Sequence, residues 1–162
     1  GEGSSHPVLR AHHEGENLAQ EECSKLRVVR VPTLFGMGDH LLSPWLDQIA
    51  RGESVRVPPV RAPLRPLWTG DASLLIERAL GDEPGWPGNV EVNGPGTWTM
   101  RQLAEATCAI LGSKPSGVPH FGGASRWDHL AAQDTERDDW GRLNLGNRRN
   151  VEDWLAAVGS RS

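Results

Sequence analysis

LRVVRVPTLFGMGD, residues 26–39, is the stretch that decides the fold. Residues 26–31 are mostly apolar and rich in β-branched side chains, which is typical of a short buried strand, and Pro32 ends the run. Gly36 and Gly38 then allow a sharp turn at the carboxyl end of that strand. Open α/β sheets usually hold their ligands at this end. We therefore expect an α/β domain with a ligand-binding edge here.

Local signals predict further elements on both sides of this stretch. Helices are expected over residues 8–23, 41–51, 71–80, 99–111, 127–140 and 151–158, and short or edge strands over 54–57, 58–68 and 89–93. Thr99 and Gln102 form a capping box, the most secure signal in the chain. Asp71 and Asn150 are the expected caps of two other helices.

Several side chains can be assigned to the core or the surface from these patterns. The expected core residues are Leu74, Leu75, Ala79 and Leu80 on one helix, and Trp45, Trp68, Trp86, Trp98 and Trp154 elsewhere. Trp127 and Trp140 lie on a polar helix and are weighed as marks of a partner surface. Glu14 and Glu16 are expected on a solvated helix face.

Composition limits the class of protein. The 162 residues carry a formal net charge of −4, which argues against a nucleic-acid binder, and no apolar run approaches the roughly 20 residues of a membrane span. Cys23 and Cys108 match no metal spacing, so reduced thiols and no metal are expected. We predict a single cytoplasmic domain over residues 1–162, with residues 1–5 disordered or appended.

Three segments resemble, in the same order, the C-terminal half of the extended short-chain dehydrogenases/reductases, the NAD-dependent epimerase/dehydratase family. Residues 26–39 resemble its lrvvRlxxvyGpgd pattern. Residues 64–80, LRPLWTGDASLLIERAL, resemble RxxxHVDDxAxAixxAL, and residues 89–112, NVEVNGPGTWTMRQLAEATCAILG, resemble xynvgGpexxtlrElaeaixxxlG. The resemblance implies the substrate-binding portion of a Rossmann-like α/β fold, with a short, mostly parallel sheet and flanking helices.

Two features of the family are missing. The glycine-rich GxxGxxG motif that binds the cofactor pyrophosphate is absent from the sequence. The family's catalytic YxxxK pair aligns with Val8 and His12, and the chain contains no tyrosine. Hydride transfer by this chain alone is therefore not expected. NAD(P) is expected only with a partner chain that supplies the Rossmann half.

The resemblance also implies candidate site residues. Gly36 and Gly38 would line a substrate cleft, with a purely backbone turn as the alternative, and Arg65 and the nearby Arg61 would bind a diphosphate or form surface salt bridges. The cofactor contacts would be Pro32, Thr33 and Leu34, only if a Rossmann partner is present. The acid/base candidates are His12, Asp39 and His40, with surface or turn roles as the alternative.

Three functional hypotheses follow. The chain would be the substrate-binding half of an NAD(P)-dependent epimerase, dehydratase or reductase, with a nucleotide-sugar as the small-molecule substrate and a Rossmann-half partner. Alternatively, it would be a degenerate, non-catalytic protein that dimerises through its first helix. A third reading is a cofactor-independent cyclase, isomerase or lyase that uses His12, His40 or Asp39 in the inherited cleft.

Overall fold

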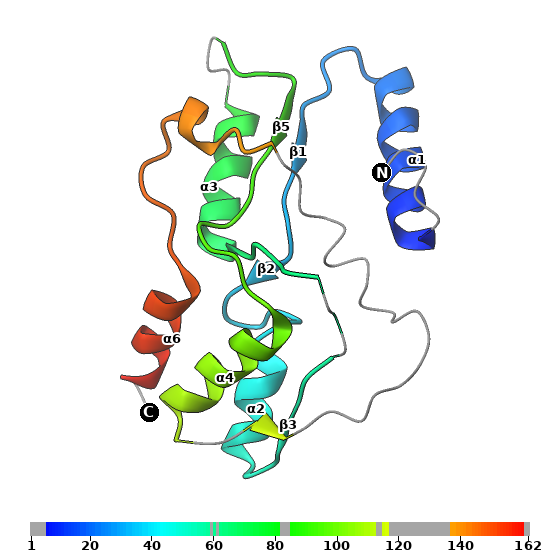
Figure 1. The fold of residues 1–162 in the computed structure, drawn as a ribbon. Helices are drawn as coiled ribbons and strands as arrows, with labels where there is room; N and C mark the ends of the chain where they lie inside the picture. Colours follow the sequence, from blue (N-terminus) through cyan, green and yellow to red (C-terminus); the bar gives the residue numbers. More distant parts are fainter. Residues whose placement is uncertain are drawn as a thin grey trace.

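The computed structural model describes residues 6–58, 60, 62–81, 85–112, 115–116 and 137–160. Its strands form parallel pairs: β1 (Val28–Arg30) with β5 (Asn89–Glu91), β2 (Leu34–Phe35) with β4 (Leu67–Trp68), and β3 (Val55–Arg56) with β6 (Pro115–Ser116). Helices flank these pairs (Figure 1). The predicted α/β class, with short, mostly parallel strands and flanking helices, is confirmed.

The helices begin and end close to the predicted positions. They are α1 (Pro7–Glu22), α2 (Ser43–Ala50), α3 (Thr69–Leu80), α4 (Met100–Ile110) and α6 (Val151–Gly159), with a 3-10 helix η1 (Trp140–Leu143). The capping box of α4 is confirmed, because Thr99 Oγ1 accepts the Gln102 N–H at 3.1 Å and Gln102 Oε1 accepts the Thr99 N–H at 2.8 Å. Asn150 caps α6 as predicted, accepting the Asp153 N–H at 2.7 Å.

Two predictions for helix α3 were wrong, and one strand was not predicted. Asp71 does not cap α3, because the helix begins at Thr69 with Trp68 at its N-cap; the carboxylate instead accepts the Arg149 N–H at 2.9 Å. Leu80 is 81% exposed rather than buried. Residues 34–35 form strand β2, an element that the sequence pattern does not predict, because pairing with β4 selects the extended conformation.

Tryptophan placement follows the predictions with one exception. Trp45 and Trp154 are buried, and Trp68, Trp86 and Trp98 are half-buried against the core. Trp140 is also buried, and its indole N–H donates to Gly146 O at 2.8 Å, so its assignment to a partner surface was wrong. Trp127 and most of the helix predicted over 127–140 lie outside the described residues. In its described part the prediction was wrong, because residues 137–139 are not helical and Trp140 begins η1.

The buried apolar side chains form two clusters. The helices that carry the larger one, α2, α4 and α6, lie in the lower part of Figure 1, and α3 and β5, which carry the smaller one, lie in the upper part. The larger core packs α2, α4, α6 and β3 together and includes Phe35, Leu42, Trp45, Leu103 and Trp154. The smaller core packs β5 and β4 against α3 and η1 through Leu67, Ala72, Leu75, Val90, Val92 and Trp140. Strand β2 contributes to both clusters, because Phe35 lies in the larger one and Leu34 packs against the smaller one.

Candidate functional site

Asp39 holds the turn at the carboxyl end of β2. Its Oδ2 accepts the Gly36 N–H at 2.7 Å, and its Oδ1 accepts the Leu41 and Leu42 N–H groups, each at 2.5 Å. The Ser43 N–H, at 3.3 Å, is a fourth donor at the start of α2. Both carboxylate oxygens are therefore occupied by backbone donors, which assigns Asp39 a positioning role in the turn; its role as an acid/base stays a prediction.

Gly36 and Gly38 are required by this turn for different reasons. Gly36 has φ +152°, and a Cβ there would lie 2.2 Å from Thr69 Oγ1, so the turn packs directly against the start of α3. Gly38 has φ +76° with open space around it, and its N–H donates to Ser43 Oγ at 2.9 Å. Backbone geometry accounts for both glycines; a substrate contact stays a prediction for each.

Thr33 is the polar side chain at this edge with unused hydrogen-bonding capacity. Pro32 and Thr33 are buried, and Leu34 is half-buried at the start of β2. Thr33 O accepts the Leu67 N–H at 3.0 Å, but the hydroxyl has no hydrogen-bond partner among the described residues. Buried hydroxyls are normally paired, so this Oγ1 is suited to a ligand or a water molecule.

Arg65 lies in a charged cluster with residues from the C-terminal segment. Its Nη2 is 3.7 Å from Asp138 Oδ2, and Arg148 Nη1 is 2.6 Å from the same oxygen. Arg148 also donates to Asn93 O. Two guanidinium groups thus converge on one carboxylate, which leaves positive charge that a phosphate would neutralise. Arg61 lies outside the described residues.

Asp71 and Arg149 form a contact that the sequence pattern does not reveal. The Asp71 side chain is buried, and burial raises the pKa of its carboxyl, while the Arg149 N–H and charge act in the opposite direction. The Arg149 guanidinium lies over the Trp68 ring, 4.3 Å from its centroid. This contact ties the segment before α6 to the start of α3.

The histidines predicted as acid/base candidates are exposed. His12 lies on α1 and His40 in the turn before α2. The half-buried positions of α1 include Leu9, His13 and Glu16, so His12 lies off the face turned toward the body. Among the described residues, no hydrogen bond or ion pair joins His12 or His40 to Asp39. A cofactor-independent lyase or isomerase therefore has no supporting contact here.

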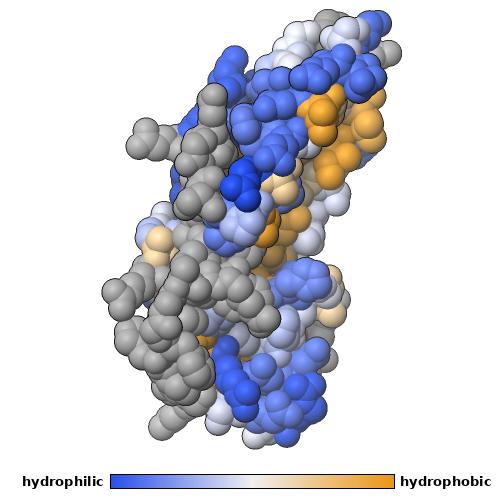
Figure 2. All heavy atoms as spheres, turned by 90° about the vertical axis from the view of Figure 1, so that its right-hand side faces the viewer, coloured by the Kyte–Doolittle hydropathy of each residue, from blue (hydrophilic) through white to orange (hydrophobic). Residues whose placement is uncertain are grey.

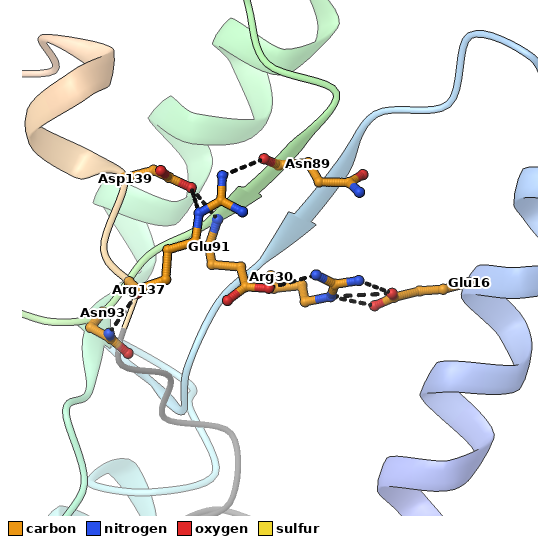
Figure 3. A network of polar contacts seen from close by, with 7 residues as sticks. All are labelled: Glu16, Arg30, Asn89, Glu91, Asn93, Arg137 and Asp139. Atoms are coloured by element: carbon orange, nitrogen blue, oxygen red, sulfur yellow. Dashed lines mark hydrogen bonds and ion pairs between the residues drawn. The ribbon is translucent and has the colours of Figure 1, made fainter. Parts of the chain in front are cut away.

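Arg30 connects α1 to the strands (Figure 3). It forms an ion pair with Glu16 of α1, and its Nη1 is 2.6 Å from Glu91 Oε1 on β5. The hydrogen bond from Arg30 lowers the pKa of Glu16, against the effect of burial. The assignment of Glu16 to a solvated face was wrong, whereas Glu14 is exposed as predicted and pairs only loosely with Arg10, at 3.9 Å.

Residues 137–139 cover the outer edge of β5. The N–H of Asp139 donates to Glu91 O at 2.8 Å, and the Glu91 N–H donates to Asp139 Oδ2 at 3.1 Å. Arg137 adds a hydrogen bond to Asn89 O (Figure 3). Burial acts to raise the pKa of Asp139, but these donors, including Arg137 at 2.7 Å, hold it below its ordinary value.

The described residues contain neither a candidate metal site nor a helix that could span a membrane. No three His, Cys, Asp or Glu side chains in that part of the chain are placed to hold a metal ion. Nor does any described helix combine the length and the apolar character needed to cross a membrane.

No protein-family model and no curated protein matches this sequence, whereas several solved structures match its fold. WbmH of Bordetella bronchiseptica, in complex with NAD+, matches with a TM-score of 0.66 and 11% identity, over 91% of this chain and 49% of WbmH. The dTDP-4-dehydrorhamnose reductase RfbD of Bacillus anthracis str. Ames, in complex with NADP, matches with a TM-score of 0.62 and 16% identity, over 93% of this chain and 52% of RfbD. WbmG of B. bronchiseptica, in complex with NAD and UDP, matches with a TM-score of 0.56 and 12% identity, over 82% of this chain and 42% of WbmG.

The similarity lies in the fold and extends over nearly the whole chain. It confirms the Rossmann-like α/β architecture expected from the resemblance. The chain spans about half the length of these three proteins.

Proposed function

We propose that this chain is the substrate-binding half of an NAD(P)-dependent epimerase-, dehydratase- or reductase-like protein and that it works with a partner carrying the Rossmann half. The half-length match carries the proposal: more than 90% of this chain corresponds to about half of WbmH and RfbD, which were crystallised with NAD+ and NADP. The chain has neither the GxxGxxG motif nor a tyrosine, so the partner would supply the pyrophosphate site and the proton-transfer group.

A nucleotide-sugar is the substrate class that the charged cluster supports. Arg65 is held only at 3.7 Å by Asp138, so a diphosphate can displace that carboxylate and accept bidentate hydrogen bonds from the guanidinium. Arg148, on the same carboxylate, would add a second positive charge. The WbmG structure holds UDP together with NAD, which agrees with a ligand of this class.

The purified chain can be tested by calorimetric titration with UDP and, separately, with NADH. We expect UDP to bind and Arg65→Ala to weaken binding roughly tenfold, because charge-assisted hydrogen bonds to phosphate are lost. Arg101→Ala is the matched control, since Arg101 is exposed on α4. NADH should not bind the chain alone. Tight NADH binding by the isolated chain would show that no Rossmann partner is needed.

A non-catalytic dimer is the second candidate, because α1 buries none of its residues and exposes Leu18 and Val8. A second α1 packed on these side chains would cover them. Sedimentation of wild type and Leu18→Glu tests this arrangement: a wild-type dimer that the variant dissociates supports it, and a wild-type monomer at high concentration contradicts it.

A further inference from the structure

Asp138 joins two arginines that come from distant parts of the chain. Its Oδ2 is 2.6 Å from Arg148 Nη1 and 3.7 Å from Arg65 Nη2. Arg65 precedes β4, whereas Arg148 lies between η1 and α6. The three side chains are between 18% and 31% exposed, so a ligand can reach them. We call these three residues the Asp138 network; two guanidinium groups and one carboxylate give it an excess of positive charge.

The position of the Asp138 carboxylate is built into the fold. Its Oδ1 accepts the Trp140 N–H at 3.3 Å, at the start of η1. The next residue, Asp139, bonds through its N–H and its side chain to the backbone of Glu91 on β5. An anchored segment therefore presents Asp138 to the arginines, and the carboxylate can leave them by rotating about its own side-chain bonds.

Two other networks among the described residues differ from this one in charge or in burial. Arg30 faces Glu16 and Glu91, so two carboxylates outweigh one guanidinium there (Figure 3). Asp139 also meets two arginines, but its side chain is only 3% exposed and accepts a backbone N–H as well. Of the three networks, the Asp138 network is the one that combines excess positive charge with a carboxylate within reach of a ligand.

The side of the molecule that carries α1 offers a different kind of surface. Figure 2 looks onto this side and shows apolar side chains reaching the surface among hydrophilic ones in the upper part of the molecule. Apolar groups do not replace the hydration that a phosphate loses on binding. The Asp138 network is therefore the better place for a diphosphate.

Arg148 is bound more closely to Asp138 than Arg65 is, and other contacts also hold it in place. Its Nη1 donates to Asn93 O, and its guanidinium lies over the Trp140 ring, 5.5 Å from the centroid. Because charge-assisted contacts weaken with distance, the 3.7 Å pair leaves Arg65 open to a ligand, while the 2.6 Å pair occupies Arg148. A phosphate can reach Arg148 fully only by displacing Asp138.

We propose that the Asp138 carboxylate is an internal competitor of the ligand: it occupies the position of the second phosphate of a diphosphate and withholds Arg148 until the ligand displaces it. This inference rests on the proposed function and names the residue that limits the affinity of that site. A diphosphate has two linked phosphate groups, so it can engage Arg65 first and then replace Asp138 at Arg148. The exchange restores the hydrogen bonds of Arg148, and the cost of moving Asp138 keeps binding weak.

The test compares Asp138→Asn with Asp47→Asn by calorimetric titration with UDP and, separately, with inorganic pyrophosphate. Asparagine keeps an oxygen for the Trp140 N–H and removes the charge that competes at Arg148. Asp47 is exposed on α2, so its replacement makes the same change in net charge without altering a contact of the network. Circular dichroism spectra that match wild type show that each variant has folded.

We expect Asp138→Asn to bind UDP and pyrophosphate about tenfold more tightly than wild type, because the ligand no longer has to break the ion pair with Arg148. Asp47→Asn should bind both ligands within about twofold of wild type, since solvent and salt screen an exposed charge. Arg148→Gln should weaken UDP binding about twofold in wild type but about tenfold when combined with Asp138→Asn, because only then does Arg148 contact the ligand fully.

A second measurement follows the carboxylate itself. Both of its oxygens belong to one planar group, so rotation away from Arg148 also takes Oδ1 from the Trp140 N–H. Hydrogen exchange at the Trp140 amide should therefore become faster when UDP binds to wild type and stay unchanged in Asp138→Asn. If this amide in wild type exchanges at the same rate with and without UDP, Asp138 stays in place and the proposal is overturned.

The remaining outcomes separate the role of Asp138 from the proposed function. If UDP binds wild type but binds Asp138→Asn no more tightly, or if Asp47→Asn gains as much affinity, the internal competitor is overturned and nucleotide binding stands. If Asp138→Asn gains affinity for pyrophosphate but UDP binds no better than pyrophosphate, the role of Asp138 is supported and the nucleotide-sugar substrate is overturned. If neither ligand binds wild type or Asp138→Asn, both proposals are overturned.

Discussion

At the scale of single residues, the Asp39 carboxylate accepts hydrogen bonds from four backbone N–H groups, which indicates that it shapes the turn. It receives N–H groups from both ends of the turn, since Gly36 precedes it and Leu41 and Leu42 follow it. The two leucines open the segment leading into α2 and are themselves buried. One carboxylate therefore sets the direction of α2 relative to β2.

Asp39→Ala should lower the free energy of unfolding by about 2 kcal/mol, because it leaves partly buried N–H groups without an acceptor. Urea denaturation followed by circular dichroism measures the loss. Asp47→Ala is the control: Asp47 is exposed on α2, and its replacement should stay within about 0.5 kcal/mol of wild type. Equal midpoints for the two variants would contradict the positioning role of Asp39.

The buried Asp71 leads to a pH-dependent prediction. Burial raises the pKa of Asp71 in the folded state, so its ionised form destabilises the fold above that pKa, and the penalty disappears as pH falls below the ordinary Asp value. Asp71→Asn keeps an acceptor for the Arg149 N–H and removes the charge. We expect the variant to be more stable than wild type at pH 7.5, with the difference shrinking toward pH 4. If wild type were more stable than Asp71→Asn at pH 7.5, the prediction would be wrong.

At the scale of elements, α1 differs from the other α-helices described because it packs no side chain into a core. The Glu16–Arg30 pair replaces the apolar face that α3, α4 and α6 use. Partly exposed ion pairs stabilise weakly, so α1 should unfold or detach locally while the rest of the domain stays folded.

Glu16→Gln should therefore increase hydrogen exchange across α1 while the global free energy of unfolding changes by less than about 1 kcal/mol. Wild type should show the same loosening at acidic pH, because the lowered pKa of Glu16 means that the pair is lost as pH falls through that value. Glu14→Gln is the control, since Glu14 pairs loosely with Arg10 within the helix. If α1 amides in both variants exchange alike, the pair does not hold the helix.

The turn between β2 and α2 supports a prediction about how elements pack. Gly36→Ala should cost about 1–3 kcal/mol, because the new Cβ would clash with Thr69 and the backbone angle is unfavourable. Gly38→Ala has the backbone strain without the clash and should cost less. Chemical denaturation of both variants separates the two causes. If both lose the same free energy of unfolding, the Thr69 side chain moves away from the new Cβ without cost.

At the scale of the whole molecule, the two cores should differ in local stability. The larger core is enclosed by α2, α4 and α6, whereas the smaller core lies beside β1, which among the described residues pairs on one side only. Native-state hydrogen exchange should show Val90 and Val92 opening at a lower free energy than Leu103 and Ala104 of α4. Equal protection of the two sets would indicate one cooperative unit.

The amino-acid sequence alone determined the elements whose signals are local. Thr99, Gln102 and Asn150 mark helix starts through side chains that bond to backbone within the same turn, so their effect does not depend on the rest of the fold. The run at residues 26–31 likewise predicts a strand from its own composition. The absence of GxxGxxG and of tyrosine, which shapes the functional proposal, is also a property of the sequence.

Only the tertiary structure decided which groups meet across long chain separations. Asp71 reads as a helix cap, yet it bonds to Arg149, 78 residues away, and Glu16 reads as solvated, yet it pairs with Arg30. Trp140 reads as a partner surface, yet it fills the smaller core. Such contacts depend on how elements pack and on which charges lose water, and neither is encoded in local spacing. The pairing of β1 with β5 is decided in the same way, because the neighbours of a strand are a property of the tertiary structure.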